Sequence, residues 1–322
     1  MSALNVLEST ESVLAESKFV SIDRAKLKEM CQKWAENPFE TPPWDTEVHW
    51  SSEGPELANY ILLLDSLNFC FWPDKGETRW TIDYKGKTMG GYQALAASLK
   101  RAVENGLPII SADWMASATL EDAAGIFAGT GVIPLLNKRH EHINETGRVL
   151  LEKYDGKFVN AIESCKKSAV ALVNLLSAEF SSFHDEPSWK GRQIRILKRA
   201  QITVTDIFGS YNGQGPASFT DINVLTAYAD YKIPQVLRAL GIMKYAQELA
   251  EKVDSQTLIP AGSEEEIEIR VAMIWSVEYI RRELEALGCP RQAYELDWFL
   301  WNLGQSPLPG ERPYHRTRTI FY

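Results

Sequence analysis

The chain has 322 residues, of which 45% are hydrophobic and 24% charged, so we expect a globular core and exclude extensive disorder. Its 34 Lys and Arg against 43 Asp and Glu give a formal charge of −9, and no long basic run occurs. Because extended DNA or RNA is bound largely through Lys and Arg at the phosphates, this balance argues against an extended nucleic-acid partner but not against a small anionic ligand.

The N-terminal segment and the cysteines suggest where the protein works. The first twenty residues carry three Glu and lack the basic start of a signal peptide. The most apolar run, residues 60–64, ends at Asp65, far short of the ~20 residues that span a membrane. The four cysteines are widely separated and form no C-x-x-C motif. We therefore expect a cytoplasmic, or also nuclear, protein with no membrane partner; no feature specifies an oligomeric state.

The spacing of apolar residues in the first third of the chain mostly predicts helices. Residues 1–11 are predicted to be a flexible lead, and residues 27–34 a helix that stops near the following Asn and Pro. Residues 38–60 contain several Pro and Gly and are predicted to be a loop. Alternating residues over 80–89 with a central Lys-Gly predict a β-hairpin, followed by a helix over 92–103.

Helical signals dominate the remainder. A helix start is predicted at Thr119, one long apolar stripe over 158–176, and a Pro-opened helix over 234–245. Ser263 and three following Glu form a capping-box pattern, and residues 296–301 belong to a final aromatic helix. Without repeats or linkers, the chain is expected to form one mainly α domain over 1–322, with a small β-hairpin insertion.

Motifs for nucleotides and metals are missing. The sequence contains no G-x-x-x-x-G-K-[ST], G-x-G-x-x-G or G-x-S-x-G. His140 and His142 are two residues apart, so on a helix they point to different sides, and a solvated helix face is favoured over a metal pair. We predict no metal ligands and no organic cofactor.

Polar residues inside apolar runs are the first candidate site residues. Asp65 and Asn68 lie in a run that continues through Phe71 and Trp72. An amide between aromatic faces suits a flat heterocycle, but a core segment with a satisfied amide is the commoner outcome.

Charged residues at helix ends are the second group of candidates. Lys198 and Arg199 could clamp a phosphate or simply be solvated. Asp230, just before Pro234, is either a helix cap or a carboxylate that points into a cleft. Asp297 enters the aromatic helix and is either exposed or part of a pocket.

The C-terminal tail is aromatic and is expected to pack rather than fray. Within it, His315 and Arg316 could reach an anion, and simple surface charge is the alternative.

Several long segments resemble a known family, the queuosine salvage proteins, which are queuosine 5′-phosphate N-glycosylases. The resemblance runs in order from about Ser12 to Tyr322. The matching stretches are SVLAESKFV, DSLNFCFW, YKGKTMGGYQAL, RHEHINETGRVLLEKYDGKFVN, LKRAQITVTD, FTDINVLTAYADYKIPQVLRALGIMKY, EIEIRVAMIWSVEYIR, LDWFLW and PYHRTRTIFY.

This resemblance implies a fold similar to helix-hairpin-helix DNA glycosylases and hydrolysis of queuosine 5′-monophosphate to queuine and ribose 5-phosphate. It implies a catalytic Lys/Asp pair at Lys198 and Asp230. Asp230 is interpreted as an electrostatic stabiliser and general base, with covalent attack as the alternative. Lys198 is interpreted as binding phosphate or orienting Asp230, with a nucleophilic amine as the alternative.

The remaining substrate contacts are hypotheses placed on the same segments. The base pocket is assigned to Asn68, Phe71, Trp72 and Asp297, and the cationic arm of the base to Asp65 or Asp297. Anion contacts are assigned to His49, Arg199, Tyr231, Lys232 and His315. A glycosylase of polymeric nucleic acid and a non-catalytic binder of a modified nucleoside remain the alternatives.

Overall fold

The computed structural model describes residues 3–41 and 43–322, and within them the protein is mainly α-helical, as predicted. The helices are α1 (Val6–Ala15), α2 (Arg24–Glu36), α3 (Glu56–Ser66), α4 (Gly91–Glu104), α5 (Ala112–Ser117), α6 (Leu120–Ile126), α7 (Leu136–Tyr154), α8 (Phe158–Ser164), α9 (Ala169–Glu179), α10 (Lys198–Ser210), α11 (Lys232–Ala239), α12 (Gln247–Asp254), α13 (Glu264–Ala286) and α14 (Ala293–Leu303). Three antiparallel strand pairs are present, β1 (Val20–Ile22) with β6 (Met243–Tyr245), β2 (Thr81–Tyr84) with β3 (Lys87–Gly90), and β4 (Ser188–Trp189) with β5 (Arg192–Gln193).

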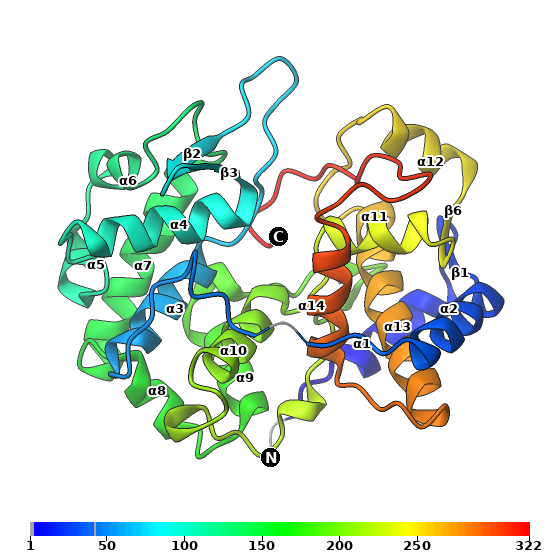
Figure 1. Ribbon diagram of the computed structural model, residues 1–322, viewed down its shortest axis with the longest axis horizontal. Coiled ribbons are helices and arrows are strands. Elements are labelled where there is room, and N and C mark those ends of the chain that lie inside the picture. The colour runs from blue at the N-terminus through cyan, green and yellow to red at the C-terminus, as the bar shows by residue number, and fades with distance from the viewer. Residues whose placement is uncertain (1–2, 42) are drawn as a thin grey trace.

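The helices form two groups, which lie left and right in Figure 1. In the first group α3 is buried along nearly its whole length and contacts α4, α7, α8 and α10. Helices α5 and α7 approach closely at Gly147, where an added Cβ would lie 2.2 Å from the backbone nitrogen of Ala116. Only glycine permits this approach, so the sequence sets the spacing of these helices.

The second group is built around α13. Ser263 caps this helix by accepting the backbone N–H of Glu266, as the capping pattern predicts. Helix α13 is buried on most of its surface and contacts α1, α2, α11 and α14. One contiguous cluster of buried apolar residues runs through both groups.

The C-terminal tail joins the two groups and packs, as expected from its aromatic residues. The backbone N–H of Ile259 donates to the carbonyl of Arg316 at 2.8 Å, and that of Cys70 donates to the carbonyl of Tyr322 at 2.9 Å. Figure 1 shows this red segment ending between the groups. The tail therefore closes one side of the space between them.

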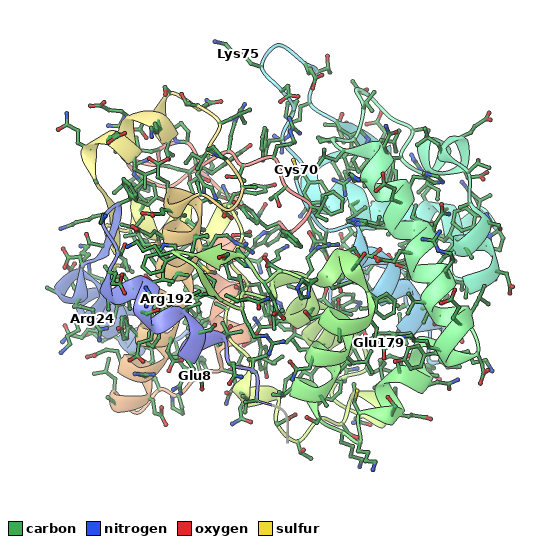
Figure 2. The ribbon with its side chains drawn as sticks, turned by 180° about the vertical axis from the view of Figure 1, so that it is seen from behind. Glu8, Arg24, Cys70, Lys75, Glu179 and Arg192 are labelled. Carbon is green, nitrogen blue, oxygen red and sulfur yellow. The ribbon has the colours of Figure 1, made fainter. Side chains whose placement is uncertain are left out.

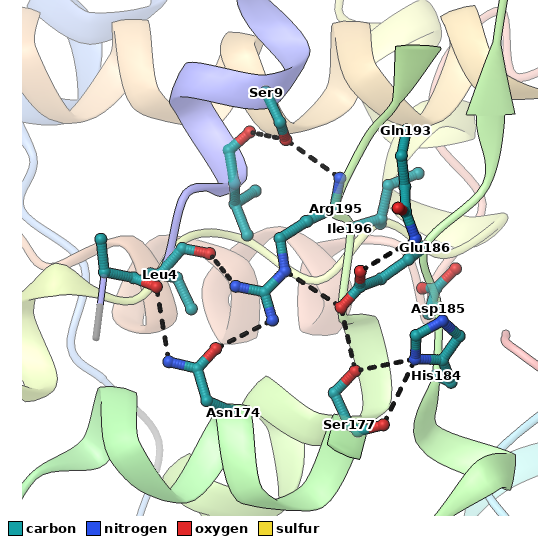
Figure 3. A network of polar contacts seen from close by, with 12 residues as sticks. Leu4, Ser9, Asn174, Ser177, His184, Asp185, Glu186, Gln193, Arg195 and Ile196 are labelled. Atoms are coloured by element: carbon teal, nitrogen blue, oxygen red, sulfur yellow. Dashed lines mark hydrogen bonds and ion pairs between the residues drawn. The ribbon is translucent and has the colours of Figure 1, made fainter. Parts of the chain in front are cut away.

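The prediction of a flexible lead is wrong for residues 6–11, which belong to α1. Val6 and Thr10 are fully buried against the core. Arg195 anchors the segment, because its guanidinium donates to the carbonyl of Leu4 at 2.9 Å and its backbone N–H to Ser9 Oγ at 3.0 Å (Figure 3). Residues 1–2 of the predicted lead lie outside the described residues.

Three predicted boundaries also differ from the structure. The loop predicted over 38–60 ends earlier, because α3 begins at Glu56. The stripe over 158–176 is two helices, separated where Lys166 and Lys167 adopt positive φ angles of 49° and 66°. The Pro-opened helix ends at Ala239, and its predicted end at residue 245 lies in β6 instead. The predicted hairpin is confirmed as β2 and β3.

Two further findings concern membranes and metals. None of the helices in the described ranges combines the length and apolarity needed to cross a membrane. Within residues 3–41 and 43–322, no group of three or more His, Cys, Asp or Glu side chains is placed to hold a metal ion.

Candidate active site

A cavity of about 480 Å³ lies between the two helix groups. It is lined by the starts of α4, α10 and α11, by one face of α14 and by the C-terminal tail. Two thirds of the predicted site residues meet there: His49, Asn68, Phe71, Lys198, Asp230, Tyr231, Lys232 and Asp297. The predicted Lys/Asp pair thus shares one cavity with aromatic walls.

Lys198 is the first residue of α10 and is buried in the cavity wall. The residue before it, Leu197, has a left-handed backbone (φ 54°), and the backbone N–H of Lys198 donates to Asp185 Oδ2 at 3.1 Å. The ammonium group donates to the carbonyl oxygen of Asn68 at 3.2 Å. Burial lowers the pKa of Lys198 to about 8, against the opposing effect of Asp230. A left-handed backbone is strained at a leucine, and the surrounding fold maintains this strain at the start of α10, where it positions the Lys198 side chain.

Asp230 precedes α11 and uses one oxygen as a helix cap. Its Oδ1 accepts the backbone N–H groups of Lys232 at 2.9 Å and Ile233 at 2.8 Å. No hydrogen bond from a described residue reaches Oδ2, so this oxygen is available to a ligand. Burial raises the pKa of Asp230, and the charge of Lys198 opposes that rise. Both interpretations of Asp230, cap and cavity carboxylate, therefore apply.

Asp297 is a second carboxyl group in the wall. It is 5% exposed and its Oδ2 accepts the backbone N–H of Tyr228 at 2.8 Å. Burial and then the neighbouring Asp230 raise the pKa of Asp297 well above its ordinary value. The side chain therefore keeps its proton to a higher pH than an exposed aspartic acid does, and in the protonated form it can donate a hydrogen bond.

Four predicted residues are not brought to the cavity lining: Asp65, Trp72, Arg199 and His315. Arg199 is committed to carbonyl oxygens, those of Asp65, Ser66 and Ser182 among them, so it holds the backbone and is not placed as a phosphate clamp. Trp72 packs beneath Arg318, whose guanidinium lies 4.2 Å from the ring centre.

The other two lie behind the wall. Asp65 is fully buried and both of its oxygens lack a hydrogen-bond partner among the described residues; burial raises its pKa. His315 contacts the hydroxyl of Tyr322 at 3.2 Å, and burial lowers its pKa to about 3. A neutral, buried imidazole is unsuited to attract an anion.

His49 lines the cavity but is not placed as an anion ligand. Its Nδ1 contacts the carbonyl of Asp45 at 2.6 Å and its Nε2 the hydroxyl of Tyr92 at 2.9 Å. Burial lowers the pKa of His49 to about 4, so it is neutral at physiological pH. The ring acts as wall, stacked on Trp44 with the ring centres 4.2 Å apart.

Sequence reasoning missed several lining residues. Asp206 follows Lys198 and Ile202 at i, i+4 and i+8 on α10, and this spacing is a signal that could have identified it. Arg79 lies on the segment before β2, whose tip carries Lys75 (Figure 2). No local pattern distinguished Arg79, because only the fold brings it to the cavity. The other missed residues with aromatic rings are Trp44, Tyr92, Tyr228, Trp298, Trp301, Tyr314 and Tyr322.

Comparison with known proteins identifies the family of the chain. Residues 48–322 match the protein family described as queuosine salvage protein. A protein of Sphaerobacter thermophilus named queuosine 5′-phosphate N-glycosylase/hydrolase is 48% identical over 99% of this chain and 98% of its own length. Proteins of the same name from Dictyostelium discoideum (36% identical, 98% of each chain) and Mus musculus (35%, 99% of each) are also similar. With its Lys/Asp cavity and a family match over most of its length, the chain belongs to the queuosine salvage protein family.

Proposed function

We infer that this protein hydrolyses the N-glycosidic bond of queuosine 5′-monophosphate and releases queuine and ribose 5-phosphate, which makes the base available for reinsertion into tRNA. The observation that carries this inference is the cavity in which Lys198 and Asp230 meet. The names of the similar proteins support the substrate class. The reaction adds the hydroxyl of water to the anomeric carbon and returns a proton to the base, so water is the only co-reactant.

Asp230 is proposed to act on the sugar. Cleavage of an N-glycosidic bond builds positive charge on the anomeric carbon and ring oxygen, which a nearby carboxylate stabilises. With Oδ1 held by two backbone N–H groups, Oδ2 is fixed in direction and available to that charge or to the attacking water. The charged Lys198 favours the ionised form of Asp230 and orients it.

Asp297 and Asn68 are proposed to act on the base. Queuine is a 7-deazaguanine and lacks the N7 lone pair through which ordinary purines are activated, so its departure needs help at another edge. Because burial raises the pKa of Asp297, its protonated form is suited to donate a proton or hydrogen bond there. Asn68 supplies donors and acceptors, and Phe71 supplies an aromatic face.

The 5′-phosphate is proposed to lie toward the cations at the other side of the cavity. Arg79 lies over Gly90, where an added Cβ would be 3.3 Å from its Nε, and it also lies beside Tyr314. Tyr314 packs against Tyr231 with ring centres 4.8 Å apart, next to Lys232. Binding energy gathered at the phosphate positions the sugar against Asp230.

The proposal is tested by incubating the purified protein with queuosine 5′-monophosphate, in the presence of chelator, and identifying the product by mass spectrometry. We expect free queuine and ribose 5-phosphate. A parallel incubation with intact queuosine-containing tRNA should release no base, because the charge of −9 opposes polymer binding. Release from tRNA alone would favour a polymer glycosylase, and tight binding without turnover would favour a binding protein.

A further inference from the structure

The cavity holds a carboxylate that the proposed reaction does not use. Asp206 lines the cavity, is only 4% exposed, and accepts no side-chain hydrogen bond from any described residue. It lies on α10 on the same face as Lys198, eight residues further along and thus about 12 Å along the helix axis. Buried carboxylates without partners are costly, so this group is expected to serve a ligand.

Aromatic side chains surround this end of α10. At Gly209, one turn after Asp206, an added Cβ would lie 3.3 Å from Trp298 and 3.7 Å from Trp44. Tyr92 lies beside Asp206 and also lines the cavity. The indole Nε1 of Trp44 is buried without a hydrogen-bond partner among the described residues. The site therefore combines one carboxylate, aromatic faces and one unused donor.

The charges around Asp206 select the sign of the ligand. Asp65 and Asp297 are its acidic neighbours, and Lys198 is the cation that faces it. The nearby His49 is neutral. The cations Arg79 and Lys232 lie instead toward Tyr314 and Tyr231. Burial and then the neighbouring Asp65 raise the pKa of Asp206 well above its ordinary value, so its ionised form is favoured only when a cation lies beside it. A cationic ligand at this end of the cavity would supply that partner.

The surroundings also distinguish between kinds of cation. A metal ion requires a group of ligating side chains, and no such group of three or more exists among the described residues. Aromatic faces around a carboxylate are instead suited to an organic ammonium, which gains cation–π attraction in addition to its ion pair. The unused Trp44 donor would suit a hydroxyl group on the same ligand.

We propose that Asp206 binds the ammonium of the cyclopentenediol arm of the base, with the arm's ring between Trp44 and Trp298, and that it thereby selects the arm-bearing nucleotide. This proposal rests on the proposed function. It moves the arm's carboxylate partner from Asp65 or Asp297, as predicted from the sequence, to Asp206. Asp65 lies behind the wall, and Asp297 is assigned to the base edge.

The test compares three nucleotides on wild-type protein and on Asp206→Asn. They are queuosine 5′-monophosphate, its 7-aminomethyl-7-deazaguanosine analogue, which keeps the ammonium but lacks the ring, and 7-deazaguanosine 5′-monophosphate, which lacks both. Asp206→Asn should raise KM about 10- to 100-fold for the two ammonium-bearing nucleotides and leave KM for the third unchanged. Asp113→Asn, an exposed acid on α5, is the matched control and should change none of the three.

Each other outcome has a definite meaning. Equal losses on all three nucleotides, or no change on any, would overturn the assignment of Asp206. If wild-type protein releases no base from queuosine 5′-monophosphate, the proposed function fails instead. If Asp206→Asn does not fold, the wild-type KM values decide: a lower KM for the aminomethyl nucleotide than for 7-deazaguanosine 5′-monophosphate supports the ammonium site, and equal values overturn it.

Discussion

The guanidinium of Arg270 and the carboxylate of Asp185 form a buried two-bond ion pair, with N–O distances of 2.9 and 2.6 Å. The pair reaches both members of the Lys/Asp pair through the backbone. Asp185 also accepts the N–H of Lys198 at 3.1 Å, and Arg270 Nε donates to the carbonyl of Ala229, the residue before Asp230, at 3.3 Å. One ion pair therefore holds the starts of two helices in register.

Replacing Arg270 by Met is expected to lower both stability and turnover. Asp185 would remain buried without its partner, which costs roughly 3–5 kcal/mol of unfolding free energy. In the protein that remains folded, kcat should fall more than KM rises, because the helix starts are no longer held. Denaturant unfolding and steady-state kinetics measure the two effects.

Two further variants separate positioning from general damage. Arg270→Lys keeps the charge but not the two-bond geometry, so kcat should lie between wild type and Arg270→Met. Lys33→Met removes an exposed ion pair with Glu29 and should change stability by less than about 1 kcal/mol. Normal kcat in folded Arg270→Met would contradict the positioning role.

The pH dependence of kcat/KM should have two limbs. On the acid side activity falls as Asp230 takes up a proton, and because burial raises its pKa this fall lies at a higher pH than for an ordinary aspartate. Above about pH 8 activity falls because Lys198, whose pKa burial lowers to about 8, loses its proton. In Lys198→Arg the guanidinium stays charged, so the alkaline fall should disappear whatever the absolute rate. An unchanged alkaline limb in this variant would assign it to another group.

Asp297→Asn should lower kcat on queuosine 5′-monophosphate by about 100-fold, a typical effect of losing a general acid. The amide oxygen still accepts the Tyr228 N–H, so the wall is preserved. On p-nitrophenyl ribose 5-phosphate, whose leaving group needs no acid, the variant should stay close to wild type. Equal losses on both substrates would show that Asp297 does not act on the leaving group.

Arg79→Ala should raise KM for queuosine 5′-monophosphate by about tenfold, because a charge-assisted contact to phosphate is lost. The KM for the nucleoside queuosine, which has no phosphate, should not change. Lys75→Ala, at the exposed tip of the same loop, is the control and should affect neither substrate. A similar rise in KM for the nucleoside would show that Arg79 does not bind the phosphate.

Local signals predicted much of the fold. Capping residues and apolar spacing located helices such as α6, which Thr119 caps, and α13, which Ser263 caps. Features that depend on backbone conformation were not predicted. The apolar stripe looked continuous, but it is interrupted where Lys166 and Lys167 adopt positive φ angles, and lysine is not a residue type that indicates such angles. Residues 6–11 were predicted to belong to a flexible lead, because their burial depends on contacts with the distant Arg195 and α13, which the local sequence does not show.

The candidate site also contains residues that the sequence predicted and residues whose orientation only the packed fold decides. Lys198, Asp230 and Asp297 lie at helix starts or in an aromatic helix, so sequence patterns drew attention to them, and the structure brings all three to one cavity. The sequence did not reveal that Arg199, adjacent to Lys198, points away to carbonyl groups. One residue along a helix turns a side chain by about 100°, and only the packed fold decides which neighbour faces the ligand.

The most direct test of the account is single-turnover base release by Asp230→Asn, measured beside queuosine 5′-monophosphate binding by the same variant. The amide can still accept the backbone N–H groups of α11, so the fold and the binding should persist. The account predicts release slowed by about 1,000-fold or more, because the charge that stabilises the cationic sugar is lost. Release within a few-fold of wild type would contradict it.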